Sequence, residues 1–419
     1  MAAPSCHPVA RSAPRPPARL SPPGATPYNC WMSPRARLFV AFVSTGFIGY
    51  IALGSVLGRV RGDSTYGQLA VFNEVMRIVL DAYVDPVNLD RTMAGARLGL
   101  TEALDGDSAY LEPEEFRLYQ QPSRDDGDVG LVLTRRFSFL MVVSARAGSP
   151  ADKAGVKAGD VIKTIDGRHS RPLPAPVGQR LLRGAPGSVV KLTLLRAASD
   201  PIDLSLTRER LSPAPPKSRM LEDGAGYLKV PEFPSRVADD IRGELLALRR
   251  GGARTLVLDL RDSGDGAPAE AVKVAELFLH GGVVSKLTGM KVPEQILSAD
   301  ASRSAWDLPM AVLVDTGTAG PAEIVAAALL DAGRAPLVGE HTFGRAAVQK
   351  TVPLPEGGLV VTVGKYVSPK GNAIHGKGLE PTVPVDTSTE EEAAEGAPAH
   401  DLILEKALEV LKGEHKKAA

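Results

Sequence analysis

The sequence predicts a layered sheet body of the α/β or α+β class, with a smaller β-rich module before it and one apolar helix near the N-terminus. Three observations lead to this prediction. Short apolar runs typical of buried strands alternate with helical patterns over residues 226–365. Several strand-like runs, separated by Gly and Pro turns, occupy residues 129–196. Residues 38–58 contain no charged side chain.

Composition limits the classes of function. With 419 residues, 44% of them apolar and 23% charged, the chain can bury a sizeable core and is expected to form two or more domains. Lys plus Arg and Asp plus Glu both number 49, and no basic run with interleaved aromatic residues occurs, so we expect no nucleic-acid partner. Cys6 and Cys30 both lie near the N-terminus, and the histidines lack ligand spacing. We therefore expect neither a metal nor a cofactor.

The N-terminal segment predicts a membrane anchor. Residues 1–37 are rich in Pro, Ala and Arg and are expected to be disordered. Residues 38–58 are long enough to cross a bilayer as a helix, which takes about 20 residues. More arginines precede this run than follow it, so we expect a cytoplasmic N-terminus and an exported body. The alternatives are a buried core helix and a cleaved signal peptide, although no clear A-x-A site follows the run.

These features predict a location for the whole chain. We expect a single-pass protein of the inner (cytoplasmic) membrane, held through residues 38–58. Its body then lies in the periplasm or another extracytoplasmic space.

A helical region is expected over residues 64–125. Apolar residues recur at helical spacing over residues 67–82 and again over residues 93–104. The acidic, Gly-containing run at residues 125–128 ends this periodicity. It marks the start of the β-rich module, residues 126–210.

The β-rich module contains a run of turns and apolar strand residues, GSPADKAGVKAGDVIKTIDG, at residues 148–167. Gly155 and Gly159 permit turn conformations that other residues resist, and Val161 and Ile165 supply a buried strand. Strands are expected at residues 129–134, 139–144, 161–165 and 189–196, and a short helix at residues 177–182. The run resembles the conserved core of a PDZ domain of the circularly permuted bacterial type.

This resemblance implies a binding site for peptide tails. In such domains a tail adds as a strand beside a hydrophobic-Gly-hydrophobic loop and the strand that follows it, and pockets take its side chains. By resemblance, the loop and the facing helix here contribute Val129, Gly130, Leu131, Val132, Val177 and Leu181. The alternative is a β-rich spacer that binds nothing.

The body, residues 211–390, follows the module and begins with a Pro-rich linker. Its apolar runs predict strands at residues 226–230, 255–260, 310–314, 336–338 and 359–365, and helices at residues 237–249, 267–279 and 321–331. Strands that alternate with helices indicate a layered sheet. Residues 391–419 are expected to form a further helix and a basic tail.

Five blocks of the body resemble, in content and order, those of a known family. The blocks are GYLKVPEF from Gly226, TLVLDLRDSGDG from Thr255, TAGPAEI from Thr318, TFGRAAVQ from Thr342 and GKYVSPKGNAIHGKGLEPTVPV from Gly364. They resemble the signature blocks of the carboxyl-terminal processing peptidases, which are tail-specific serine peptidases of family S41. In that family a PDZ module is set into the peptidase body. The resemblance covers residues 66–386.

The resemblance implies a catalytic Ser-Lys dyad, in which a serine hydroxyl attacks the scissile carbonyl and an unprotonated lysine takes its proton. The serine lies in a block like TASASEI and the lysine in a block like TFGKGxVQ, whose glutamine helps to orient the lysine. On this alignment the serine position is Gly320, the lysine position is Arg345, and the glutamine is kept as Gln349. Glycine has no side chain to attack with, and arginine keeps its proton near neutral pH.

The oxyanion-hole block departs from the family as well. The family's DLRNNPGG is matched by DLRDSGDG at residues 259–266, so Asp265 takes a glycine position beside Gly266. A carboxylate close to a developing negative charge opposes the stabilisation that such a hole provides. Three parts of the catalytic machinery therefore differ together.

We therefore expect a non-catalytic relative that binds protein C-terminal tails, as an adaptor or as the regulatory partner of an active tail-specific peptidase. Two alternatives stay open. One is a serine-type endopeptidase that cleaves near protein C-termini through a rebuilt site, for which Thr318 and His341 are candidates. The other is a purely structural envelope protein.

Overall fold

The computed structural model of the chain describes residues 34–121, 126–197, 199–221, 224–387 and 401–418. Within these ranges, the side chains of residues 34–37, 40, 41, 47, 49–65 and 414–418 lie outside the description. The chain divides into two compact units, Met1–Val87 and Asn88–Ala419. The disorder predicted for residues 1–37 falls almost wholly outside the described residues and stays a prediction.

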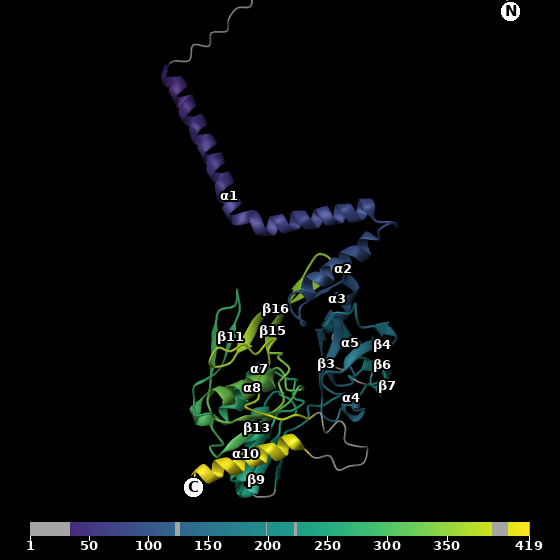
Figure 1. Cartoon of the computed structure of the whole chain (residues 1–419), viewed down its shortest axis with the longest axis vertical. Coiled ribbons are helices and arrows are strands. Elements are labelled where there is room, and N and C mark those ends of the chain that lie inside the picture. The colour runs from purple at the N-terminus through teal and green to yellow at the C-terminus, as the bar shows by residue number, and fades with distance from the viewer. Residues whose placement is uncertain (1–33, 122–125, 198, 222–223, 388–400, 419) are drawn as a thin grey trace, which may run out of the picture. The chain divides into compact units, whose positions relative to one another are not determined.

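The first unit contains one long helix, α1 (Pro34–Ala82), drawn in purple and blue in Figure 1. It includes both the predicted membrane span, residues 38–58, and the predicted amphipathic helix, residues 67–82. Among the residues that the structure describes, no helix is both long enough and apolar enough to cross a membrane. Many side chains of the predicted span lie outside the description, and the structure does not confirm the span.

The second unit opens with α2 (Leu89–Glu102), β1 (Ala109–Leu111) and α3 (Pro113–Gln120). Strand β1 pairs in antiparallel fashion with β16 (Gly358–Val367), near the other end of the chain. The predicted helical region therefore adds a strand to a sheet of the body. This pairing brings the loop that contains Asp107 to the body.

The β-rich module folds around its own apolar core. Its sheet has the strand order β2-β3-β4-β6-β7, with β5 paired to β4. Its elements are β2 (Leu131–Arg136), β3 (Phe139–Ala145), α4 (Pro150–Lys153), β4 (Val161–Ile165), β5 (Arg168–His169), α5 (Ala175–Leu181), β6 (Val189–Leu195) and β7 (Ile202–Thr207). The sequence does not predict β5 or β7, which bury few residues. Among the described strands β2 is an edge strand, and α5 packs beside it.

The larger sheet of the body has the strand order β17-β14-β13-β10-β9-β8. Its strands are β8 (Lys217–Met220), β9 (Ala225–Lys229), β10 (Thr255–Asp259), β13 (Met310–Val314), β14 (Leu337–Gly339) and β17 (Val383–Pro384). All neighbouring pairs run parallel except β8 with β9. The carboxyl ends of β9, β10 and β13 therefore meet at one edge, which is where open parallel sheets place their functional loops.

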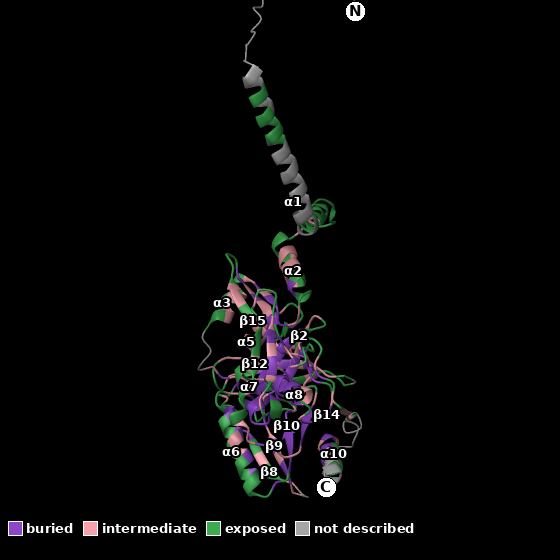
Figure 2. Cartoon of the chain, turned by 90° about the vertical axis from the view of Figure 1, so that its left-hand side faces the viewer, coloured by how far each residue is buried: buried purple, intermediate pink, exposed green. Residues whose placement is uncertain are grey.

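Helices cover both faces of this sheet, which explains why its central strands are apolar throughout. The helices are α6 (Val237–Arg250), α7 (Pro268–Glu276) and α8 (Pro321–Asp331) on one face and α10 (Leu402–Ala418) on the other. Successive residues of a strand point to opposite faces of the sheet. Leu258 packs with α6, α7 and α8, whereas Val257 packs with α10. Figure 2 shows buried residues gathered around β10 and α8. The predicted layered α/β body is confirmed.

A second sheet of the body has the strand order β1-β16-β11-β12, with β15 paired to β16. The remaining elements of this part are β11 (Val283–Thr288), β12 (Gln295–Ser298), the 3-10 helix η2 (Ala301–Arg303) and β15 (Ala347–Pro353). Of these strands the sequence predicts only β16. Strand β12 is mostly exposed, β15 is half-buried, and neither carries a clear apolar alternation, so their pattern is weak.

Candidate functional site

Gly320 occupies a turn immediately before α8 that glycine adopts without strain and a larger residue would not. Its φ is 54° and its ψ is −116°, a conformation that residues with a side chain rarely adopt. A Cβ added at Gly320 would lie 3.4 Å from the Arg345 carbonyl oxygen and 3.7 Å from that of Gly264, which is ordinary contact. The turn resembles in geometry the strand-to-helix turn that presents a nucleophile in hydrolases. The position therefore has room for a small side chain but carries none.

Arg345, at the predicted lysine position, forms an ion pair. Its Nε atom lies 3.1 Å from each carboxylate oxygen of Asp107. Asp107 is buried and also accepts a hydrogen bond of 3.1 Å from the Thr134 hydroxyl of β2. A guanidinium that keeps its proton can neutralise a carboxylate but cannot take a proton from a nucleophile. Arg345 thus serves as a structural cation that connects the body, the loop before β1 and the β-rich module.

Glu323 connects the two blocks that the sequence singles out. Its buried carboxylate accepts backbone hydrogen bonds from Gly320 at 3.1 Å, Gly344 at 2.7 Å and Arg345 at 2.8 Å, and another from the Thr342 hydroxyl. Burial raises the pKa of Glu323 to about 7, and these hydrogen bonds act in the opposite direction. All four partners donate, which suits the ionised form. Glu323 therefore holds the turn at α8 and the TFGR loop in one fixed arrangement.

The Asp265 carboxylate accepts a hydrogen bond from a backbone N–H of the predicted oxyanion region. Its Oδ1 accepts a 2.8 Å hydrogen bond from the N–H of Gly266, and its Oδ2 lies 3.6 Å from Arg146 Nε. Gly266 has a φ of 125°, and a Cβ there would lie only 2.4 Å from the Phe233 carbonyl oxygen. The glycine is thus required by the fold, while its N–H is already taken by a carboxylate. That Asp265 opposes an oxyanion stays a prediction.

Pro321 removes a second donor. In the comparable turn of hydrolases, the N–H of the residue after the nucleophile stabilises the oxyanion. Proline has no N–H, and its fixed φ suits the first position of a helix, which is where Pro321 lies in α8. The proline is visible in TAGPAEI, but its consequence for the oxyanion follows only once α8 is known to begin there.

The other candidate residues of the body, Gln349, Thr318 and His341, each contact a different partner. Gln349 lies 3.5 Å from the Thr362 hydroxyl through its Nε2, and lines a cavity of about 200 Å³ together with Asp107 and Arg345. The fully buried Thr318 hydroxyl donates to the Leu260 carbonyl oxygen at 3.0 Å. His341 pairs instead with Glu380 at 3.5 Å. No contact among the described residues joins Thr318 to His341, so the structure does not assemble that alternative pair.

The predicted tail-binding residues divide between two environments. Val129 and Leu131 are buried in the core of the β-rich module. Val177 lies instead in a separate apolar cluster with Ala109, Leu111 and Val360, whereas the half-buried Leu181 packs against both this cluster and the core of the module. Helix α5 turns Val177 toward β1 and β16 in this structure, and a contact between Val177 and a bound tail stays a prediction. A helix of two turns has several possible faces, and the sequence alone does not show which one packs.

On α5, Gln179 reaches β2, although its place in the sequence pattern does not mark it as a site residue. Its carboxamide bonds to the backbone of Leu131 and Leu133. Its helical spacing from Ala175 could have indicated a shared face. A polar residue in a short helix is nevertheless more often exposed to solvent.

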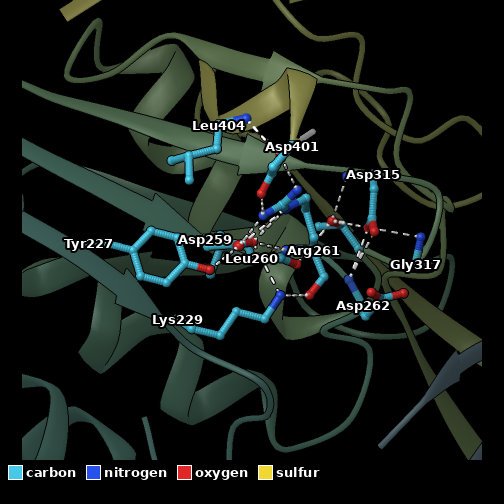
Figure 3. Close-up of polar contacts among 11 residues, drawn as sticks. Tyr227, Lys229, Asp259, Leu260, Arg261, Asp262, Asp315, Gly317, Asp401 and Leu404 are labelled. Carbon is cyan, nitrogen blue, oxygen red and sulfur yellow. Dashed lines mark hydrogen bonds and ion pairs between the residues drawn. The ribbon is translucent and has the colours of Figure 1, made fainter. Parts of the chain in front are cut away.

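A charged network lies at the carboxyl edge of the larger sheet (Figure 3). Asp259, fully buried, accepts hydrogen bonds from the Tyr227 hydroxyl at 2.6 Å, from Lys229 Nζ at 3.2 Å and from Arg261. Burial acts to raise the pKa of Asp259, but the charges of Lys229 and Arg261 prevail and lower it to about 2. Arg261 also binds Asp401, the residue before α10, at 2.8 Å. The network thereby fixes the DLRD loop and attaches the C-terminal helix.

A second carboxylate at this edge behaves in the opposite way. Asp315 accepts hydrogen bonds from the N–H groups of Asp262 and Gly317, both at 3.0 Å. Burial, and then the neighbouring charge of Asp262, raises the pKa of Asp315 to about 7. Within the part of the chain that the structure describes, no cluster of three or more His, Cys, Asp or Glu side chains could hold a metal ion.

Fold and site together define a hydrolase-like body of the peptidase type that carries a PDZ domain. Residues 224–385 match the sequence profile of peptidase family S41, and residues 141–196 match that of the PDZ domain. Carboxy-terminal processing protease CtpA of Bacillus subtilis (strain 168) is 30% identical over 336 residues, which cover 78% of this chain and 71% of the relative. The chain therefore belongs to peptidase family S41, and its predicted PDZ domain is confirmed.

Other relatives agree with this assignment. Carboxyl-terminal-processing peptidase 2 of the chloroplast of Arabidopsis thaliana is 36% identical over 259 residues, which cover 59% of this chain and 50% of the relative. The solved structure of a photosystem II D1 C-terminal processing protease superposes with a TM-score of 0.64 at 29% identity, and covers 81% of this chain and 90% of that one. The family and the fold are thus shown by both sequence and structure.

Proposed function

We propose that this chain binds protein C-terminal tails and does not cleave them, because it lacks the Ser-Lys dyad. The observation that carries the proposal is the pair of substitutions at one site, Gly320 for the nucleophile and Arg345 for the base. Arg345 is held by Asp107, so its charge has a structural partner. Pro321 and Asp265 further reduce the backbone donors that would stabilise an oxyanion.

Tails are the ligand class that fits this proposal best. Relatives of this chain are named carboxy-terminal processing proteases, and a PDZ domain accepts extended peptides by strand addition. A member that holds tails without cleavage would protect them or present them to an active tail-specific peptidase. We therefore propose an adaptor or regulatory role.

A second candidate function is a serine-type endopeptidase with a rebuilt site. The intact Glu323 network and the positive-φ turn at Gly320 favour it, since both belong to the frame that a catalytic site would need. The hydroxyl it would need has two nearby sources. Ser263 Oγ is buried and has no hydrogen-bond partner among the described residues, whereas the Thr318 hydroxyl is already bonded.

One experiment separates the two candidates. The purified full chain is incubated with casein and with peptides that carry free C-termini, and products are identified by mass spectrometry. We expect tail binding without cleavage. Turnover by the wild type would establish the endopeptidase and overturn the proposal, and its loss in Ser263→Ala or in Thr318→Ala would then indicate which hydroxyl to examine.

We also propose that the chain is tethered to the inner membrane with its body on the extracytoplasmic side. The support is the uncharged run at residues 38–58 and the arginines around it. Membrane fractionation after an alkaline wash tests this proposal, with a variant that lacks residues 38–58 as the control. A full chain released by the wash as completely as the deletion variant would contradict it.

A further inference from the structure

The free edge of β2 is occupied by a side chain of the same domain. Strand β2 has no strand partner on its outer side among the described residues, and α5 lies beside it. From α5, the Gln179 carboxamide donates a 2.7 Å hydrogen bond from Nε2 to the Leu131 carbonyl oxygen. Its Oε1 accepts a 3.1 Å hydrogen bond from the Leu133 N–H. These two backbone groups flank Val132 on one edge of the strand.

An added peptide strand requires the same two groups. Strand addition satisfies the exposed N–H and C=O groups of a sheet edge with those of the incoming chain. A carboxamide has a carbonyl oxygen that accepts and an NH₂ group that donates, as the C=O and N–H of a peptide unit do. It can therefore make the hydrogen bonds of one residue of an added strand. Gln179 thus already satisfies the hydrogen bonds at Leu131 and Leu133 that a tail would make.

The loop before β2 is occupied in a similar way. The Gly130 N–H donates a 2.9 Å hydrogen bond to Asp128 Oδ1, and Arg183 Nε donates one of 2.9 Å to Asp128 Oδ2. A tail carboxylate that binds to this loop needs backbone N–H donors. The Gly130 N–H already donates to a carboxylate of the chain itself, that of Asp128.

We propose that the tail groove of this PDZ domain is closed by its own side chains, and that Gln179 is the gate a tail must displace. This inference rests on the proposed tail-binding function. The cavity of about 200 Å³ beside Gln179 is lined by Leu133, Ala175, Arg345 and Gln349, so an opened groove continues toward the former catalytic site. Gln179 then sets tail affinity through the two hydrogen bonds that are lost on opening.

Removal of the gate should tighten tail binding. The probe is a fluorescein-labelled decapeptide that ends in Val-Ala-Ala with a free carboxylate, measured by fluorescence polarisation against the full chain. Gln179→Ala removes both hydrogen bonds to β2, and we expect its Kd to fall about tenfold, which equals about 1.4 kcal/mol. Gln295→Ala, at an exposed position of β12, is the matched control and should bind as the wild type does.

A second measurement reports on the closed edge without any ligand. Amide hydrogen exchange at Leu133 should be slow in the wild type and in Gln295→Ala, and fast in Gln179→Ala, because Gln179 is the acceptor of this N–H. Equal exchange in all three proteins would overturn the gate. Equal tail affinity in wild type and Gln179→Ala would also overturn it while leaving tail binding intact.

The proposed function fails separately. If no variant binds the probe but Leu133 loses protection in Gln179→Ala, the closed edge is supported and tail binding is contradicted. Binding that is as strong for the amidated probe as for the free acid would show that the loop at Gly130 takes no carboxylate. That result would overturn the part of the inference that concerns Asp128.

Discussion

The Nε atom of Arg345 lies 3.1 Å from both carboxylate oxygens of Asp107, a residue 238 positions earlier in the chain. At this distance the two groups form a charge-assisted hydrogen bond, which holds the arginine side chain in place. The guanidinium keeps its proton, so Arg345 cannot act as a base. Asp107 reaches this place because β1 pairs with β16. The substitution at the lysine position is thus accommodated by a structural partner.

The first prediction concerns this ion pair. Asp107→Asn leaves the Arg345 guanidinium, 30% exposed, without its countercharge. We expect a loss of about 1–3 kcal/mol in the free energy of unfolding, less than for a fully buried pair because solvent screens the arginine. Urea denaturation followed by circular dichroism measures it. The double variant Asp107→Asn with Arg345→Met should lose less than Asp107→Asn alone, and a larger loss would refute the coupling.

The second prediction concerns Glu323. Its four partners are all donors, so Glu323→Gln places an amide group against an N–H or hydroxyl donor in a buried site. We expect a loss of about 2–4 kcal/mol in the free energy of unfolding and faster amide exchange at Gly344. The exposed Glu294 offers a matched control, since Glu294→Gln should leave both quantities unchanged. An unfolding midpoint equal to that of the wild type would contradict the role assigned to Glu323.

The site divides into parts that the sequence predicts and parts that it does not. Gly320 and Arg345 lie in blocks whose order implies one site, and Glu323 indeed binds the backbone of both. Asp107 could not be found, because its proximity depends on the pairing of β1, which precedes the PDZ domain, with β16 near the end of the body. Gln179 was missed because a two-turn helix does not reveal which of its faces packs against a strand. Local motifs therefore identify backbone frames, while partners set by long-range pairing require the fold.

The third prediction concerns pH. Burial raises the folded-state pKa of Glu323 and of Asp315 to about 7, whereas unfolded carboxyl groups titrate near about 4. Between these values the folded chain binds more protons than the unfolded chain. The stability that each group contributes is therefore complete below about pH 4 and is lost as the pH rises through about 7. Asp259, whose pKa is lowered to about 2, acts in the opposite sense, and only below about pH 4.

Urea titrations at pH 5, 6, 7 and 8 measure this dependence. We expect the free energy of unfolding to fall over this range, with roughly 3 kcal/mol of the fall due to Glu323. Glu323→Gln should show a shallower fall, because one of the carboxyl groups with a raised pKa is removed. An unchanged slope in Glu323→Gln would show that the folded-state pKa of Glu323 is not raised into this pH range.

The fourth prediction concerns restoration of catalysis. Gly320→Ser with Arg345→Lys returns a nucleophile and an amine, and the space at Gly320 admits a small side chain at a strain cost of about 1–3 kcal/mol. We nevertheless expect no cleavage of casein by this double variant. The new lysine would lie beside Asp107, whose charge favours its protonated form, so that it could not serve as a base. Pro321 would still lack the N–H, and Asp265 would still hold that of Gly266.

Removing these three obstacles should produce activity. A variant that adds Asp107→Asn, Pro321→Ala and Asp265→Gly to the double change should cleave casein at a rate measurable by release of labelled peptides. Each addition alone should fall short, because a free base and two oxyanion donors are needed together. Cleavage by the double variant itself would show that Asp107, Pro321 and Asp265 do not block the chemistry. The substitutions at Gly320 and Arg345 alone would then explain why the wild type does not cleave.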